Sequence, residues 1–302
     1  MLHHILETQQ FDRALITEVF DLATSLDTTR DDSLKGRILA TLFFEPSTRT
    51  RFSFESAMFR LGGQVLTAEN ALEFSSASKG ETLEDTIRVM NSYADAIFIR
   101  HPEIGAADRA AHVSKVPIIN AGDGAGQHPT QALLDIYTIH REIGHLDNIH
   151  VCIVGDVRYY RAARSLSYLL GRFDHVHLTL VSLPELRMSE ELKAYLDKHE
   201  VTYTEVESLD PVIGDIDVLY QTRMQKERLS AETYEQANGR YIIDRSRADA
   251  MKEGSIIIHP LPRVGEITPE VDDSPRAVYF RQVRYGLLIR MALLKMVLSN
   301  HG

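Results

Sequence analysis

A buried strand that runs directly into a polar helix start constrains this chain more than any other feature. Residues 38–44 read ILATLFF, and this short apolar run, rich in β-branched and aromatic types, predicts a strand inside a sheet. The next residues read EPSTRTR and include Ser47, a preferred helix N-cap residue. Apolar residues then recur at helical spacing over residues 54–61. The chain therefore delivers a string of hydroxyl and guanidinium groups into the first turn of a helix.

The first turn of that helix has the chemistry of an anion site. Its unpaired backbone N–H groups and the positive end of the helix dipole attract negative charge before any side chain is counted. Ser47, Thr48 and Thr50 add hydroxyl donors, and Arg49 and Arg51 add positive charge at the same place. A phosphate-sized oxyanion is the ligand that this combination favours. An ordinary capped helix with two solvated arginines is the alternative interpretation.

Bulk properties limit the protein classes that need to be considered. A length of 302 residues predicts two domains, because single cores stop growing near this size. A net charge of −10 argues against general binding of nucleic acid or of a membrane surface, and no apolar run approaches the roughly 20 residues of a membrane helix. The N-terminus lacks signal-peptide features, and the single cysteine, Cys152, lies in an apolar run typical of core packing. We therefore expect a reducing, cytoplasmic setting. Because His3, His4 and His301 fit no metal-ligand spacing, we expect no metal.

Predicted strands and helices alternate along both halves of the chain at crossover-length spacings. This alternation predicts an α/β fold with two doubly wound parallel-sheet domains. We place the domain junction at a long helix over residues 130–141, so residues 1–129 with 286–302 form one domain and residues 130–285 the other. The expected strands are residues 38–44, 64–66, 94–99, 116–120, 150–154, 176–181, 201–206, 217–220 and 255–258. The other expected helices are residues 11–27, 48–61, 82–91, 162–170, 189–198 and 285–299.

Six of these strands run directly into a polar or proline-rich string. The strings are EPSTRT, RHPE, NAGDGAGQHPTQ, GDVRYYR, QTRMQKER and HPLPR. Ligands of open α/β sheets bind beyond the carboxyl ends of the strands, so we expect the six strings to line one cleft between two sheets. The glycines of the third string do not have the spacing of a dinucleotide-binding loop. Taken singly, His128, Lys79, Arg161 and Arg223 also fit ordinary loop or surface roles.

Taken together, the strings resemble one known family. STRTR, RHP, HPTQ, a strand ending in GD with an arginine five residues on, TRMQKER and HPLPR stand in the order found in the aspartate and ornithine carbamoyltransferases, and nearly the whole chain resembles the aspartate branch. The resemblance implies transfer of the carbamoyl group of carbamoyl phosphate to L-aspartate, which gives N-carbamoyl-L-aspartate and phosphate. It implies no cofactor. This reaction is the first committed step of pyrimidine synthesis.

The resemblance also implies roles for individual residues around carbamoyl phosphate. Those matching the phosphate cradle are Ser47, Thr48, Arg49, Thr50 and Arg100. Those pointing at the carbamoyl oxygen, where negative charge develops, are Thr50, Arg100 and His128, and with Arg49 they form the catalytic set. Those matching contacts to the carbamoyl nitrogen are Gln131 and the backbone carbonyls around Pro260 and Leu261.

For aspartate, the resemblance implies arginine clamps, which suit carboxylates because the planar guanidinium binds them bidentately. Arg161 matches the α-carboxylate clamp, and Arg223 with Gln225 matches the reader of the β-carboxylate. The residues that resemble partners orienting these arginines are Glu45 and Arg228.

The loop over residues 69–81 carries an implication about assembly. Ser75 and Lys79 match residues that reach into the active site of a neighbouring subunit, where Lys79 also meets aspartate, so the resemblance implies a homotrimer with shared sites. A surface loop without such a role fits the local composition equally well. Some family members pair with a regulatory chain or with dihydroorotase, and the sequence does not distinguish these cases. An ornithine carbamoyltransferase and a catalytically silent trimeric scaffold are the alternatives. Arg223 and the HPLPR string favour aspartate over ornithine.

Overall fold

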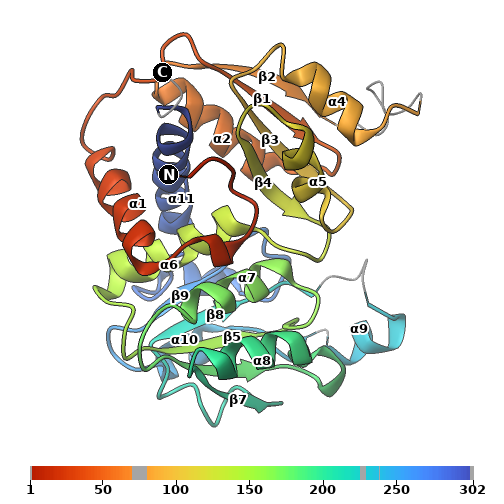
Figure 1. Ribbon diagram of the computed structural model, residues 1–302. Helices are drawn as coiled ribbons and strands as arrows, with labels where there is room; N and C mark the ends of the chain where they lie inside the picture. Colours follow the sequence, from red (N-terminus) through yellow and green to blue (C-terminus); the bar gives the residue numbers. More distant parts are fainter. Residues whose placement is uncertain (1, 70–79, 225–228, 238, 300–302) are drawn as a thin grey trace. The chain divides into compact units, whose positions relative to one another are not determined.

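The computed structural model describes residues 2–69, 80–224, 229–237 and 239–299 (Figure 1). The chain separates into two compact units. Unit 1 combines residues 1–133 with residues 285–302, and unit 2 comprises residues 134–284. The sequence places the same two boundaries at 129/130 and 285/286.

Unit 1 is built on a parallel four-stranded sheet with the strand order β2-β1-β3-β4. A helix joins β1 to β2 and another joins β3 to β4, as parallel neighbours require. The strands are β1 (Ile38–Phe43), β2 (Gln64–Ala68), β3 (Ala96–His101) and β4 (Ile118–Asp123). The helices are α1 (Arg13–Ser25), α2 (Thr48–Arg60), α4 (Leu83–Met90), α5 (Ala106–Val113) and parts of α6 (Pro129–Ile143) and α11 (Tyr279–Leu298).

Both faces of the unit 1 sheet are covered, which explains the continuous apolar run of β1. On one face, Leu42 and Ile97 belong to a buried cluster that includes Ile87 of α4 and several alanines of α5. On the other face, Phe98 packs against Phe54 of α2 with ring centroids 3.9 Å apart. The sheet therefore holds the end of β1 and the start of α2 in a rigid setting.

The N-terminal segment pairs with the edge strand β4. The Ile5 amide donates to the Ile118 carbonyl at 2.8 Å, and the Asn120 amide donates to the Ile5 carbonyl at 2.7 Å. Further along, the buried Thr8 contacts the side chain of Gln127, its amide and hydroxyl lying 2.9 Å and 2.7 Å from Gln127 Oε1. The edge of the sheet is thus closed by the N-terminal segment, which precedes β4 by more than 100 residues.

Unit 2 is built on a parallel five-stranded sheet with the strand order β7-β6-β5-β8-β9. Cys152 lies in its core cluster and is fully buried, which confirms the expected packing role. The strands are β5 (His150–Val154), β6 (His177–Val181), β7 (Thr202–Val206), β8 (Val218–Gln221) and β9 (Ile256–Ile258). The helices within the unit are α7 (Arg161–Leu170), α8 (Glu190–Lys198), α9 (Ala231–Ala237) and α10 (Arg245–Ala250). Short 3-10 turns cover Thr8–Gln10 in unit 1, and Pro184–Leu186 and Pro269–Asp273 in unit 2.

The structure corrects several predicted boundaries. Strand β3 extends through Arg100 and His101, and β4 through Asp123, because their backbones pair with neighbouring strands even where the side chains are polar. Helix α11 begins at Tyr279, six residues before the predicted start. Three short helices, α5, α9 and α10, were not predicted. Among the described helices, none is long and apolar enough to cross a membrane.

Candidate active site

The polar string after β1 forms the N-terminus of α2, as predicted. Ser47 occupies the N-cap position in extended backbone conformation, and the helix begins at Thr48. The Ser47 side chain makes no capping hydrogen bond to a described residue of the helix, and Arg49 is exposed at the first turn. Thr50 is buried at 7% exposure. The turn therefore keeps backbone donors of the helix start and hydroxyl groups available for an anion.

Only one of the two arginines in this string remains at the turn. Arg51 forms an ion pair with Glu69, and its Nε lies 3.7 Å from Glu55 Oε1 one helical turn on. Its guanidinium also lies over the ring of Phe52. The expectation that both guanidinium groups gather at the anion site is wrong for Arg51, because two carboxylates hold it elsewhere on α2.

Arg100 stands beside this turn because of the strand order. In the order β2-β1-β3-β4 the connections leave β1 and β3 in opposite directions, and such a switch point opens a crevice at the carboxyl ends of the two strands. The Phe44 amide donates to the Arg100 carbonyl at 2.9 Å across that point. Arg100 Nε lies 3.5 Å from Glu45 Oε2. Within unit 1, Glu45 therefore lies beside Arg100. The resemblance instead implies that Glu45 orients Arg161 and Arg223.

His101, the next residue, is held neutral by its surroundings. Its Nδ1 accepts a hydrogen bond from the Glu103 amide at 3.1 Å, and its ring lies 4.8 Å from that of Phe44. Burial lowers the pKa of His101, and the positive charge of Arg109 lowers it further. Nearby carboxylates raise this pKa but do not cancel the effect of burial. No sequence motif indicates a role for His101. Its position and partners indicate a support for the Arg100 backbone.

The glycine-rich string after β4 delivers His128 to the start of α6. Asp123 Oδ1 accepts the Gln127 amide at 2.7 Å and Oδ2 accepts the Gly105 amide at 2.8 Å, so one carboxylate joins the loops that follow β3 and β4. Gly124 has φ +51°, and an added Cβ would lie 2.4 Å from a backbone carbonyl oxygen. These glycines therefore serve a tight turn. His128 is 5% exposed and Gln131 is 8% exposed in the first turn of the helix.

In unit 2, the carboxyl ends of β5 and β8 meet at a second switch point. Thr222 Oγ1 lies 2.8 Å from the Val154 carbonyl and accepts the Asp156 amide at 2.9 Å. Gly155 has φ +114°, and an added Cβ would lie 2.4 Å from Thr222 Oγ1. These contacts fix the backbone on either side of the two candidate arginines, because Arg161 begins α7 and Arg223 follows Thr222.

Tyr160 provides evidence that the two candidate arginines of unit 2 act on one place. Burial raises the pKa of Tyr160 to about 12, and the positive charges of Arg223 and Arg161 oppose this rise. Both guanidinium groups therefore influence the same tyrosine hydroxyl. Two guanidinium groups that follow the adjacent strands β5 and β8 suit a ligand with two carboxylates.

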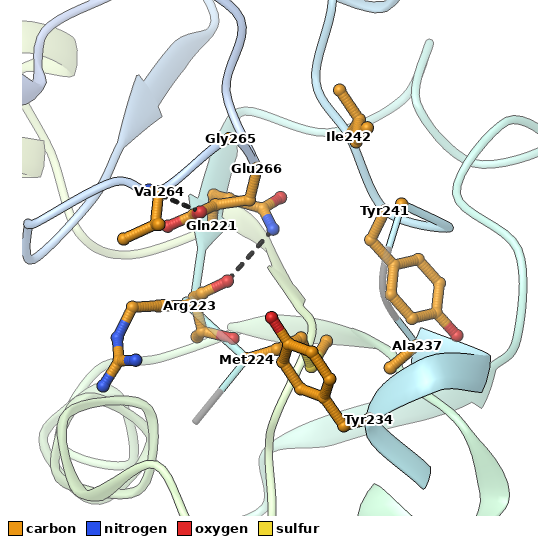
Figure 2. Close-up of a pocket in the computed structure, with 12 residues that line it drawn as sticks. Gln221, Arg223, Met224, Tyr234, Ala237, Tyr241, Ile242, Val264, Gly265 and Glu266 are labelled. Carbon is orange, nitrogen blue, oxygen red and sulfur yellow. Dashed lines mark hydrogen bonds between the residues drawn. The ribbon is translucent and has the colours of Figure 1, made fainter. Parts of the chain in front are cut away.

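Arg223 also lines a cavity of about 320 Å³ within unit 2 (Figure 2). The cavity lies between the end of β8, helix α9 and the loop after β9. In Figure 2 the guanidinium of Arg223 points away from Tyr234 and Tyr241. The carboxylate of Glu266 and the buried side chain of Gln221 add polar groups to the wall.

The loop after β9 holds Pro260 and Leu261. Leu261 has φ +54°, a left-handed backbone conformation that few side-chain-bearing residues adopt. Within the described ranges, no cluster of three or more His, Cys, Asp or Glu side chains could hold a metal ion.

Comparisons with known proteins cover almost the entire chain. Residues 3–141 match the family model described as aspartate/ornithine carbamoyltransferase, carbamoyl-P binding domain, and residues 147–297 match the Asp/Orn binding domain of the same family. The chain belongs to the aspartate/ornithine carbamoyltransferase family. The resemblance seen in the sequence is thereby confirmed, as is the predicted architecture of two parallel-sheet α/β domains.

Relatives in this family carry names of the aspartate branch. Aspartate carbamoyltransferase 3, chloroplastic, from Pisum sativum is 53% identical over 98% of this chain and 78% of its own length. The aspartate carbamoyltransferase catalytic subunit of Methanocaldococcus jannaschii is 48% identical over 99% of both chains. Among solved structures, the M. jannaschii catalytic subunit has a TM-score of 0.92 at 47% identity, covering 99% of both chains. The Trypanosoma cruzi aspartate transcarbamoylase in complex with N-(phosphonacetyl)-L-aspartic acid has a TM-score of 0.93 at 42% identity, covering 98% of this chain and 96% of that one.

Within the family, the structure brings together part of the predicted site in each unit. Unit 1 gathers Ser47, Thr48, Arg49, Thr50 and Arg100 around one switch point and places His128 after the neighbouring strand β4. Unit 2 places Arg161 and Arg223 after the adjacent strands β5 and β8. The predicted residues Ser75, Lys79, Gln225 and Arg228 lie outside the described residues. The roles assigned to all of these side chains stay predictions.

Proposed function

We propose that this protein transfers the carbamoyl group of carbamoyl phosphate to the amino group of L-aspartate, giving N-carbamoyl-L-aspartate and phosphate. One observation carries the proposal: relatives 48–53% identical over 98–99% of this chain are named aspartate carbamoyltransferase. Solved relatives support it, because the T. cruzi protein, 42% identical to this chain, has been crystallised with carbamoyl phosphate and aspartate.

The proposal assigns the phosphate of carbamoyl phosphate to the turn between β1 and α2. A dianion suits this turn because the helix N-terminus, hydroxyl groups and Arg49 supply donors and positive charge. When an amine attacks the carbonyl carbon, its oxygen becomes negative, and Thr50, Arg100 and His128 are assigned to stabilise it. Removing one donor of this kind typically raises the barrier by about 3 kcal/mol.

The proposal assigns aspartate to unit 2. The guanidinium groups of Arg161 and Arg223, whose charges both act on Tyr160, suit a dicarboxylate substrate. Ornithine carries a positively charged side chain, and Arg223 would repel it. The attacking amine of aspartate must be neutral, and we assign the proton that it loses to the departing phosphate.

A substrate comparison tests this proposal. The purified protein is given carbamoyl phosphate with L-aspartate or with L-ornithine, and the carbamoylated product is measured. We expect turnover with aspartate, loss of turnover in Arg49→Ala, and a raised KM for aspartate in Arg223→Ala. Citrulline formation would show that unit 2 accepts ornithine. No turnover with either amine, from a folded protein, would favour a silent scaffold.

We further propose a homotrimer with shared active sites, to which Ser75 and Lys79 contribute from the neighbouring subunit, and a cytoplasmic location. Membership of the family supports the trimer. The single buried Cys152 supports a reducing compartment, although the plant relatives are named as chloroplastic. Mixing inactive Lys79→Ala and inactive Arg100→Ala proteins would restore activity if sites are shared, and would restore none if each chain is self-sufficient. Sedimentation would also detect a regulatory chain or dihydroorotase, and cell fractionation tests the location.

A further inference from the structure

A chain of buried hydrogen bonds crosses unit 2 and ends at the loop after β9. The Tyr220 hydroxyl donates to Asp135 Oδ2 at 2.9 Å, and Gln282 Nε2 donates to Asp135 Oδ1 at 2.6 Å. Gln282 Oε1 in turn accepts the His259 amide at 3.0 Å. All four residues are at most 2% exposed. The start of this loop is therefore tied to three other elements, α6, β8 and α11.

The His259 ring continues this chain in a defined protonation state. Its Nδ1 lies 2.7 Å from the Leu261 amide nitrogen, which only donates, so Nδ1 must accept and carry no proton. The proton of the neutral ring is then on Nε2, which lies 2.8 Å from Glu266 Oε1 and donates to it. The side chain of His259 is fully buried in this arrangement.

Glu266 closes the loop from the other side. Its Oε2 accepts the Val264 amide at 2.8 Å (Figure 2), and its Oε1 receives the hydrogen bond from His259. Burial by itself raises the pKa of the Glu266 carboxyl. The hydrogen bonds from His259 and the Val264 backbone outweigh burial and lower this pKa below its ordinary value. The carboxylate is therefore charged near neutral pH. His259 and Glu266 together bracket the backbone of residues 260–264.

The bracketed backbone has a conformation that needs support. Leu261 has φ +54°, and a side-chain-bearing residue keeps this conformation only when its surroundings hold it there. The hydrogen bond from the Leu261 amide to His259 Nδ1 is such a restraint. The backbone carbonyls of Pro260 and Leu261 lie in this restrained segment. Together they offer two acceptors to an –NH2 group, which needs one acceptor for each of its N–H bonds.

We propose that His259 and Glu266 are positioning residues that hold the carbonyls of Pro260 and Leu261 for the –NH2 of the carbamoyl group. The inference rests on the proposed function, because it takes carbamoyl phosphate as the ligand. Inorganic phosphate lacks the amide. Disturbing the pair therefore weakens the binding of carbamoyl phosphate and leaves the binding of inorganic phosphate unchanged.

Two substitutions at one position separate the two bonds of the His259 ring. An asparagine amide can place its oxygen near the Nδ1 position, so His259→Asn keeps the acceptor for Leu261 and loses the bond to Glu266. A glutamine amide can reach the Nε2 position, so His259→Gln keeps the bond to Glu266 and loses the acceptor for Leu261. The variant Glu266→Gln retains only one acceptor for two donors. Glu270→Gln, at an exposed position in the same unit, is the matched control.

Titration calorimetry with carbamoyl phosphate and with inorganic phosphate tests the proposal without requiring turnover. We expect His259→Gln and Glu266→Gln to raise the Kd of carbamoyl phosphate about tenfold, the equivalent of one lost hydrogen bond of about 1.4 kcal/mol. The Kd of phosphate should stay within twofold in these variants. His259→Asn, which keeps the acceptor for Leu261, should raise the Kd of carbamoyl phosphate by less than His259→Gln does, and the control Glu270→Gln should leave it unchanged.

Three results would overturn the positioning role. In the first, the variants bind carbamoyl phosphate and inorganic phosphate more weakly by the same factor. In the second, the variants that fold bind both ligands as tightly as the wild-type protein does. In the third, the wild-type protein binds carbamoyl phosphate no more tightly than phosphate. A wild-type protein that binds both ligands as expected but makes no carbamoyl-aspartate would contradict the proposed function alone. Thermal unfolding of each variant identifies any that fails to fold. If one of the three variants does not fold, the Kd values of the other two still test the positioning role.

Discussion

The two arginines of the STRTR string offer a matched test of the anion site. Arg49 is exposed at the first turn of α2, whereas Arg51, with a side chain 20% exposed, is held by Glu55 and Glu69. Arg49→Lys keeps the charge and loses the planar fork that binds a phosphate through two N–H groups. Arg51→Lys keeps a charge between its two carboxylates. The same chemical change is thereby made two residues apart.

The expected losses of kcat/KM are larger for Arg49→Lys than for Arg51→Lys. Losing one charge-assisted hydrogen bond costs about 1.5–3 kcal/mol, so Arg49→Lys should lower kcat/KM for carbamoyl phosphate by roughly tenfold to a hundredfold. A partly exposed ion pair contributes at most about 1 kcal/mol, so Arg51→Lys should lower it by less than about fivefold. Steady-state kinetics with aspartate saturating measures both, and thermal unfolding controls for folding. An equal loss in the two variants would refute the assignment of Arg51 to a structural ion pair.

Three further predictions concern stability. Burial lowers the pKa of His150 and of His177, so both stay neutral in the fold while the unfolded chain takes up protons below about pH 6.5. Stability should therefore fall as the pH drops from 6.5 toward these lowered pKa values, and denaturation curves of His177→Gln should show a smaller fall. Gly124→Ala should lower the free energy of unfolding by more than about 1 kcal/mol, because its Cβ would meet a carbonyl oxygen, and denaturant titration measures the loss. Tyr220→Phe removes the donor to Asp135 Oδ2 and should destabilise the protein by about 1.5–3 kcal/mol in the same titration; an unchanged midpoint would contradict the role of this bond.

The elements that the sequence predicted well are those determined by local pattern. Strand β5 has the predicted bounds, and α8 begins after the N-cap Ser189, because apolar runs and caps act over a few residues. The polar ends of β3 and β4 escaped prediction because their pairing partners are distant in the sequence. Helix α11 begins early for the same reason: Tyr279 and Gln282 of its first turn are buried, and Gln282 bonds to His259 in the loop after β9.

The candidate site also has parts that local sequence predicts and parts that depend on long-range contacts. The β1–α2 turn was predictable because strand, cap and helix follow one another in the chain. The ion pairing of Arg51 with Glu69 was not, because it joins the helix to a residue beyond the next strand. The role of Glu266 was also hidden, since it depends on a hydrogen bond to a histidine seven residues earlier across a loop of unusual backbone conformation. Sequence motifs identify which side chains carry the chemistry, whereas the supports that hold them come from long-range contacts.

The central claim is that an anion site at the start of α2 and paired arginines of unit 2 together serve carbamoyl transfer to aspartate. The most direct measurement supplies carbonyl-13C-labelled carbamoyl phosphate to the wild-type protein with equal concentrations of L-aspartate and L-ornithine, and follows the label by NMR. The account predicts that the label appears in N-carbamoyl-L-aspartate, with none in citrulline above the rate without enzyme. Label in citrulline, or no enzyme-dependent transfer at all, would contradict it.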